Sequence, residues 1–283
     1  MDQVQGDHGK APVGHPVDQA EIKTLSVKTI RKEEERDLRR SQVNIMLIVF
    51  LALMLLQSIR AGEFSDPKAW FLNTLMILPG VIVGVAFHEF GHALVASKLG
   101  DPTPEAQGRL TINPVAHLEP FGLIALIFCG FGWGKPVQID PTYFRKRRRD
   151  ELLVSVAGVV MNLIIAVIFT IIFRIVISSA GSAFYGGSSD FMYYVELMIY
   201  YVIQINLVLM IFNLIPVPPL DGFNIIVEVF NLKNTEFYRV AYNYGQWILL
   251  VLLFLGFVSR ILSPAVMWCM NTLFSIFGVP LMV

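Results

Sequence analysis

The sequence predicts an all-α, polytopic membrane protein of about five to six transmembrane helices. Of its 283 residues, 55% are hydrophobic and 16% are charged, whereas soluble domains average about 45–50% and about 25%. The mean hydropathy is +0.60. The 22 basic and 22 acidic residues leave no net charge, which argues against a nucleic-acid-binding surface. The two cysteines are too few for a disulfide framework or for a zinc site built from cysteine alone.

Residues 1–41 are predicted to form a polar, flexible cytoplasmic tail. They contain 8 of the 22 Lys and Arg residues and 8 of the 22 Asp and Glu residues. The segment begins with Gly, Pro and His residues and ends in IRKEEERDLRRS, which favours a short solvated helix at its end. No apolar stretch lies within the first 40 residues, so we do not expect a signal peptide.

Apolar segments follow this tail, and residues 42–283 are predicted to form one membrane-embedded domain. A helix needs about 20 apolar residues to cross a bilayer. Residues 265–283 are apolar but short and are interrupted by Pro280, so the sequence predicts five or six spans. Residues 121–132 are too few to cross and are expected to form a re-entrant segment between the second and third spans. The five principal candidates are residues 43–59, 70–99, 152–177, 191–215 and 245–262.

The distribution of basic residues predicts the orientation in the membrane, because Lys and Arg are enriched on the cytoplasmic side. Residues 97–151 contain eight of them, and two arginines directly precede the first span. Residues 59–69 contain only two, and residues 178–190 contain none. We therefore expect a cytoplasmic N-terminus, with the second and fourth spans running from outside to inside. The run RKRRR at 145–149 is interpreted as a topology anchor with some contact to anionic lipid.

The most informative motif lies on the second span, where residues 87–92 read FHEFGH. Residues four apart share one face of a helix, so His88 and His92 can bind the same metal ion, and Glu89 can act as general base on its water. The alternative is a pair of core histidines. Two histidines and a glutamate inside a membrane span are costly, however, and indicate function. The motif predicts one Zn²⁺ ion per chain.

A catalytic zinc ion usually has three protein ligands. Asp221 is the candidate for the third, because it follows the fourth span and reaches the same end of the membrane as His92. The prolines before it cannot continue a helix, and broken backbone at membrane depth is tolerated only against protein or a water-filled cavity. One alternative is that Asp221 belongs to a turn at the membrane surface. The other candidate ligands are Glu119, Glu151 and Glu228.

These motifs resemble those of the site-2 proteases, which are intramembrane zinc metalloproteases. HEFGH at 88–92 and NLIPVPPLDG at 213–222 are similar to two signature motifs of that family, in the same order and at a similar separation. The resemblance covers about residues 70–225 and is to compact bacterial and archaeal members without a PDZ or CBS domain. Further similarity lies in GRLTINPVAHLEPFG at 108–122, GFGWGKPV at 130–137 and AGVVMN at 157–162.

The resemblance implies roles for particular residues. His88, His92 and Asp221 would be the zinc ligands, and Glu89 would be the general base. Zn²⁺ would be the only cofactor.

Three further polar residues are candidates for binding substrate or the oxyanion. Asn162 lies four residues after Gly158 on the third span, and the resemblance suggests a hydrogen bond to substrate; a polar contact between helices is the alternative. Asn213 would hold an extended substrate or, alternatively, cap the broken helix. His117 would enter the cytoplasmic side of the site or, alternatively, be a buried histidine with its hydrogen bonds satisfied.

Together these features predict an intramembrane zinc metalloprotease that cleaves transmembrane segments of membrane proteins near the cytoplasmic face. Its role would be regulated intramembrane proteolysis or the clearance of remnants. The expected partners are transmembrane protein substrates and the lipid bilayer, without nucleic acid, and the expected location is a prokaryotic cell membrane. The alternatives are a membrane-anchored zinc peptidase acting on soluble or misfolded chains, and a non-catalytic protein that binds membrane clients.

Overall fold

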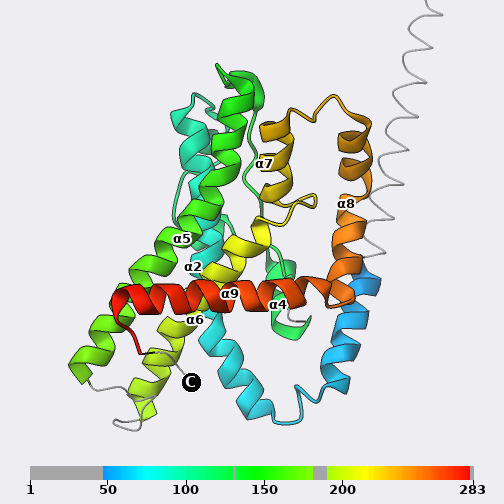
Figure 1. Cartoon of the computed structure of the whole chain (residues 1–283). Coiled ribbons are helices and arrows are strands. Elements are labelled where there is room, and N and C mark those ends of the chain that lie inside the picture. Colours follow the sequence, from blue (N-terminus) through cyan, green and yellow to red (C-terminus); the bar gives the residue numbers. More distant parts are fainter. Residues whose placement is uncertain (1–46, 130–131, 181–189, 281–283) are drawn as a thin grey trace, which may run out of the picture. The chain divides into compact units, whose positions relative to one another are not determined.

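Helices dominate the fold, as the sequence predicts. The computed structural model describes residues 47–129, 132–180 and 190–280 (Figure 1). Within these ranges it contains no β-strand and only an isolated bridge between Leu118 and Gly134. The all-α class is therefore confirmed.

Contacts divide the chain into two compact units, Met1–Val49 and Phe50–Val283, and the following description concerns the second. The polar tail predicted at residues 1–41 lies outside the described ranges. Four described helices are long and apolar enough to cross a membrane, which confirms a polytopic protein. They are Pro67–Lys98 (α2), Arg147–Ser178 in α5 (Arg147–Ala180), Phe191–Asn213 in α6 (Asp190–Asn213) and Arg260–Phe277 in α9 (Phe257–Phe277).

The last predicted spans differ from the observed helices. The apolar segment 245–262 is divided, because α8 (Glu236–Phe254) ends shortly before Gly256 and α9 begins directly after it. Gly256 has a φ of +66°, a conformation that favours glycine and turns the chain. α9 then runs across α5 and α6 rather than along them (Figure 1). The first predicted span contains a shorter apolar helix, Leu47–Arg60.

The connection between the second and third spans contains the short apolar helix that the sequence predicts. α4 (Pro120–Cys129) has 10 residues, which is too short to cross a bilayer. The chain then returns, so that the Lys135 N–H donates to the His117 carbonyl at 2.7 Å. This excursion and return is the arrangement expected of a re-entrant segment. The other elements of the connection are α3 (Thr103–Ala106), η1 (Pro114–Ala116) and η2 (Pro141–Tyr143).

Small residues bring α2 close to both α5 and α6, as is common where helices pack without long side chains between them. A Cβ atom at Gly80 would lie 2.9 Å from the Tyr201 carbonyl oxygen of α6. A Cβ atom at Gly91 would lie 2.9 Å from the Ala157 carbonyl oxygen of α5. α2 therefore approaches each of these helices nearly backbone to backbone, and this contact places the middle of α2 in the interior.

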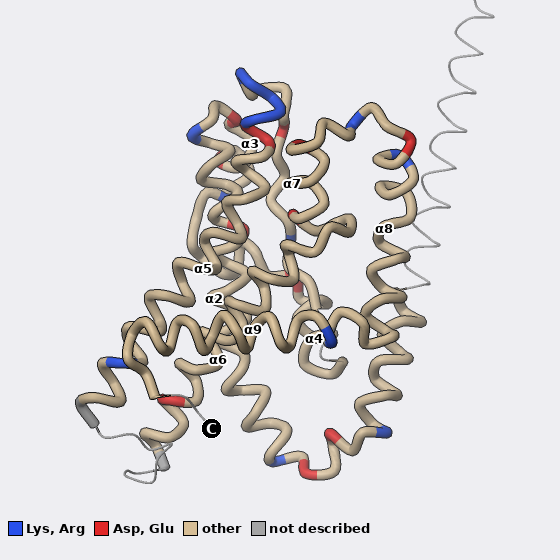
Figure 2. Tube along the Cα trace, in the orientation of Figure 1, with Lys and Arg blue, Asp and Glu red and all other residues tan. Residues whose placement is uncertain are grey.

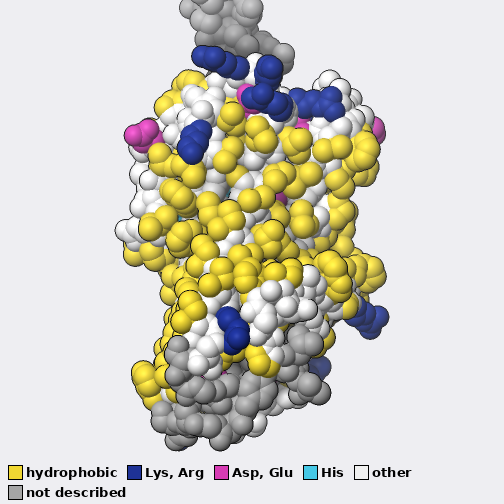
Figure 3. Space-filling model, turned by 60° about the vertical axis from the view of Figure 1, so that its left-hand side comes forward, with side chains coloured by type: hydrophobic (Ala, Val, Ile, Leu, Met, Phe, Trp, Pro, Cys, Tyr) yellow, Lys and Arg dark blue, Asp and Glu magenta, His cyan; other side chains and the backbone are white. Residues whose placement is uncertain are grey.

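Charged and apolar residues are separated along the helices. The charged residues gather mainly at the end of the helices that carries α3 and the start of α5, and the middle of the helices is almost free of them (Figure 2). Hydrophobic side chains cover the middle of the face in Figure 3. The buried apolar core lies among α5, α6 and α9, where Phe173 and Phe274 stack with ring centroids 5.9 Å apart. This distribution fits a protein embedded in lipid.

We predict that Gly80→Ala destabilises the protein by about 1–3 kcal/mol, because the added methyl group overlaps α6 backbone that cannot move independently. Thermal unfolding in detergent measures the change. Ala69→Leu is the control, since Ala69 is exposed in the first turn of the same helix. Equal melting temperatures for Gly80→Ala and the wild type would contradict the packing described here.

Candidate active site

α2 brings two imidazoles together. His88 and His92 lie one turn apart on the buried side of the helix, and their rings meet at 84° with the Nε2 atoms 3.1 Å apart. Both residues are only 8% exposed. Histidine spacing on α2 therefore produces the convergent pair that the sequence predicts.

Asp221, which is more than 120 residues later in the sequence, lies next to this pair. α6 ends at Asn213, and the proline-containing connection leads into α7 (Asp221–Phe230), whose first residue is the aspartate. Gly222 allows the tight turn, because a Cβ atom there would overlap the Leu214 carbonyl. The Asp221 Oδ2 atom lies 3.3 Å from the Nε2 atoms of both His88 and His92. Among the described residues, these three are the only group of three or more His, Cys, Asp or Glu side chains that could hold a metal ion.

The donor set fits a zinc ion. Zinc binds imidazole nitrogen and carboxylate oxygen at about 2.0–2.2 Å, and a tetrahedral arrangement then separates the ligand atoms by about 3.3–3.6 Å. The three observed separations, 3.1, 3.3 and 3.3 Å, are close to that spacing. The Asp221 Oδ2 atom is buried and has no hydrogen-bond partner within the described part of the chain, which is costly unless another group neutralises it.

Hydrogen bonds that the two histidines donate to α5 leave both Nε2 atoms free to bind a metal. The His88 Nδ1 atom lies 2.7 Å from Asn162 Oδ1, and the His92 Nδ1 atom lies 2.8 Å from the Val154 carbonyl. Both partners are acceptors, so each Nδ1 donates and carries the ring proton. Each Nε2 atom then keeps its lone pair, and the rings are held in orientation, as in metal sites generally.

Gly158 of α5 forms one wall of the site. A Cβ atom at this position would lie 2.5 Å from His92 Nε2 and 2.6 Å from His88 Cε1. The absence of a side chain therefore allows both imidazoles to pack directly against the backbone of α5.

Asn162 is fully buried, and its amide links three helices. It accepts from His88 of α2 and donates to the Gly84 carbonyl of α2 and to Asn206 Oδ1 of α6, each at 3.0 Å. In this arrangement Asn162 orients His88. Asn206, also fully buried, is a residue that the sequence analysis missed. Its signal was an amide within an apolar span, where a polar group needs a partner.

Glu89 lies beside the histidine pair on α2 and is partly exposed. Its Oε2 atom accepts the backbone N–H of Val137 at 2.8 Å. Val137 belongs to the non-helical segment that follows α4. This contact, which the sequence does not predict, fixes one carboxylate oxygen.

The other residues singled out from the sequence make contacts elsewhere. His117 is fully buried, and its Nε2 lies 2.7 Å from the Thr111 carbonyl. Asn213 donates to the Leu209 carbonyl of its own helix at 3.0 Å. The three alternative ligands have other partners: Glu119 accepts from the Gly122 N–H, and Glu151 and Glu228 form ion pairs with Lys233.

Helices of membrane-spanning length and a His-Glu-x-x-His motif joined by a distant aspartate define a class, the membrane-embedded metallopeptidases. The model of peptidase family M50 matches residues 76–201 and 188–255. The chain therefore belongs to peptidase family M50, the site-2 protease family, which confirms the resemblance seen in the sequence. It is a zinc metalloprotease of the site-2 type, and the family does not support the non-catalytic alternative.

Individual relatives agree with this assignment. The chain is 41% identical over 189 residues to the protein named "Putative zinc metalloprotease YwhC" of Bacillus subtilis, covering 65% of this chain and 82% of the relative. It is 27% identical over 214 residues to "Putative zinc metalloprotease Rip2" of Mycolicibacterium smegmatis, covering 74% and 78%. It is 26% identical over 242 residues to "Zinc metalloprotease MJ0392" of Methanocaldococcus jannaschii, covering 84% and 56%. No solved structure matches the chain.

We predict that Gly158→Ala lowers zinc affinity about 10–100-fold, the range typical of changes around metal ligands. The added methyl group would occupy the space of the two imidazoles, so both rings must move. Chelator competition with the purified protein measures the affinity.

Val160→Ile is the matched control, because it adds one methylene to the same helix at an exposed position. If Gly158→Ala bound zinc as tightly as this control, the close contact between α5 and the imidazoles would be refuted.

Proposed function

We propose that this protein is an intramembrane protease that cleaves transmembrane segments of membrane proteins near the cytoplasmic face. The proposal depends on one observation: His88 and His92 lie within a helix of membrane-spanning length, close to its end at Lys98. That end leads into the basic connection 97–151, which the distribution of Lys and Arg assigns to the cytoplasm. The products would be a released regulator or a degraded remnant.

The proposed metal site consists of His88, His92 and Asp221 and holds one Zn²⁺ ion per chain. The donor set, the separations of the three ligand atoms and the unsatisfied Asp221 Oδ2 support it. A bound zinc ion would supply a Lewis acid that polarises the scissile carbonyl and makes water more acidic.

Glu89 is the proposed general base. Its neighbour His88 is a proposed ligand, so the carboxylate stands beside the place where water is activated. The Val137 N–H holds Oε2 at 2.8 Å, and no described residue donates to Oε1. We propose that Oε1 accepts the proton of the attacking water and later returns it to the leaving amine. Because a helix hides its carbonyl groups in hydrogen bonds, the substrate must unwind locally before it can be cleaved.

The contacts of the three candidate glutamates argue against the alternative function, a membrane-anchored zinc peptidase that acts on soluble or misfolded chains and uses a glutamate as third ligand. Glu119 accepts from the start of α4, and Glu151 and Glu228 share Lys233. Moving any of them to the histidine pair would break these contacts.

The protein is an integral membrane protein, and we propose a prokaryotic cell membrane with the N-terminus in the cytoplasm. The relatives named above are from two bacteria and an archaeon, which supports the first part. The Lys and Arg distribution supports the second. Transmembrane protein substrates and the lipid bilayer are the proposed partners.

We predict that Glu89→Gln retains zinc but loses about 10²–10⁴-fold in cleavage rate, the usual contribution of general acid–base catalysis. Asp221→Ala should lose both zinc and activity, because two imidazoles alone hold the ion weakly. The measurements are zinc analysis of purified protein and cleavage of a reconstituted single-span protein.

The two variants serve as controls for each other. Wild-type turnover in zinc-loaded Glu89→Gln would refute the general base. Wild-type zinc affinity in Asp221→Ala would mean that the third ligand lies elsewhere. Cleavage of a soluble unfolded chain in place of the single-span protein would refute the proposed substrate class.

We predict that a cysteine at position 146 is protected from an impermeant thiol reagent in intact cells and reacts after the membrane is opened. Cysteine at position 65, on the opposite connection, should react from outside. Both are introduced after replacement of the native Cys129 and Cys269. Labelling of position 146 in intact cells would reverse the orientation.

A further inference from the structure

An arginine of α5 caps the far end of α7. The Arg148 Nε atom donates to the Glu228 carbonyl at 2.5 Å, and its Nη2 atom donates to the Val229 carbonyl at 2.7 Å. The last four carbonyl groups of a helix have no partner within it, and a basic side chain can satisfy them. Arg148 satisfies two of these carbonyl groups from a different helix, and both hydrogen bonds come from its one planar guanidinium group. It therefore does more than anchor the topology, the role that the sequence indicates for the run 145–149.

An ion-pair cluster lies beside this cap. Lys233, just after α7, pairs with Glu151 of α5 and with Glu228 of α7, the latter at 2.6 Å. Glu228 is 4% exposed, so a charge there needs a partner. Burial alone would lower the pKa of Lys233, but the two carboxylates raise it above its ordinary value, so the ammonium stays charged. The cluster joins α5, α7 and the following connection.

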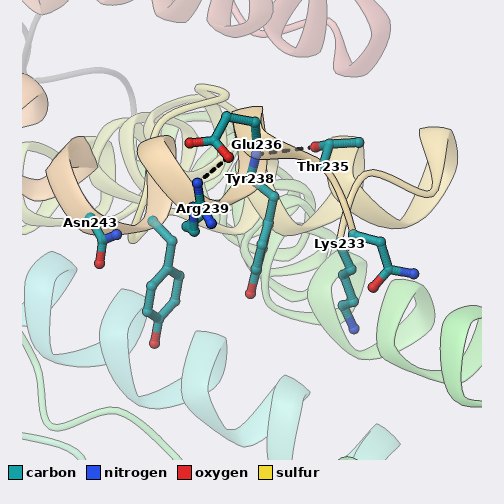
Figure 4. A pocket seen from close by; sticks show the side chains of 8 residues that line it. Lys233, Thr235, Glu236, Tyr238, Arg239 and Asn243 are labelled. Atoms are coloured by element: carbon teal, nitrogen blue, oxygen red, sulfur yellow. Dashed lines mark hydrogen bonds and ion pairs between the residues drawn. The ribbon is translucent and has the colours of Figure 1, made fainter.

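Side chains from the segment after α7 also contact α7. In Figure 4, Lys233 and Tyr238 point to the same side, and the ion pair between Arg239 and Glu236 lies apart from Lys233. Tyr238 stacks on Phe223 of α7 with ring centroids 6.0 Å apart. Phe223 is 2% exposed. α7 is thus held by an apolar contact near its start and by polar contacts at its end.

The same helix that caps α7 also holds the histidine pair. Along α5, Arg148 contacts the end of α7 and Glu151 pairs with Lys233 just after that end. Val154, Gly158 and Asn162 contact the two imidazoles. These positions recur every three to four residues and so share one face. α7 has only 10 residues, with Asp221 as its first. A shift at its clamped end therefore changes where the carboxylate lies relative to the imidazoles.

We infer that Arg148 and Lys233 are positioning residues for the third metal ligand: they fix α7 to α5 and so hold Asp221 at the correct distance from His88 and His92. The inference rests on the proposed role of Asp221 as a ligand. Neither residue contacts the proposed metal atoms; both act through the placement of α7.

Zinc affinity tests this inference without any substrate. Full-length protein in detergent is titrated with Zn²⁺ against a chelator. Arg148→Met should weaken zinc binding about 10-fold, the low end of the range for residues that hydrogen-bond to metal ligands, because Arg148 acts on Asp221 only through α7. Lys233→Met should weaken it in the same direction. The zinc affinity of Arg148→Lys should lie between those of the wild type and Arg148→Met. An ammonium keeps the charge but cannot make two parallel hydrogen bonds from one planar group.

Arg145→Met is the matched control. It removes the same charge from the same basic run, and Arg145 makes no hydrogen bond or ion pair with another described residue. Its zinc affinity should equal that of the wild type. An equal loss in Arg145→Met and Arg148→Met would overturn the inference, because the effect would then come from the charge of the run.

A double mutant distinguishes positioning from general destabilisation. Once Asp221 is replaced by alanine, its position no longer matters, so adding Arg148→Met to Asp221→Ala should cause no further loss of zinc affinity. A further loss as large as in the wild-type background would overturn the inference.

The outcome also separates this inference from the proposed function. Wild-type zinc affinity in Asp221→Ala would reject the ligand assignment itself. Weak binding by Asp221→Ala together with wild-type binding by Arg148→Met and Lys233→Met would reject only the positioning role. If Arg148→Met does not fold, Lys233→Met and Arg148→Lys decide between these outcomes.

Discussion

The two hydrogen bonds from the histidine Nδ1 atoms to α5 are the interactions on which the rest of the site depends. They set the tautomer and the rotation of His88 and His92, and so determine where the Nε2 atoms point. A free imidazole on a helix has several rotamers, and only a few bring two rings to one point. The close approach of α2 to α5 through Gly91 and Gly158 is what makes these hydrogen bonds possible. The candidate metal site is thus a product of helix packing as much as of the His-Glu-x-x-His motif.

Buried polar groups elsewhere in the interior follow the same logic. Asn162 donates to Asn206 and to the buried carbonyl of Gly84, and Asn206 donates to the Val202 carbonyl, so that neither of these two buried amides lacks a partner. Such a network is most valuable when every member is satisfied. Here it also connects α6 to the orientation of His88, because Asn162 contacts both.

The extent to which the sequence predicts this structure differs between local and long-range features. The spacing of His88 and His92 is local, and it is sufficient to predict that both point the same way. Asp221 could be assigned because the direction of the fourth span and the prolines before it restrict its position. The partners of Asn162 and Arg148 depend on how α5 is rotated against its neighbours, which no local pattern encodes. The break at Gly256 was missed because one glycine in an apolar run is a weak signal, and Pro264 lies inside α9 without ending it.

The contact at Gly158 has a steric consequence for the histidine pair. Because the backbone of α5 lies directly against both rings, that side of the centre has no room for a peptide or for water. A peptide cleaved here would therefore approach from a side that α5 does not occupy. The two faces of the imidazole pair are therefore not equivalent, because the backbone of α5 closes one of them. The lack of a side chain at Gly158 thus lets the helix backbone itself form the barrier on that face.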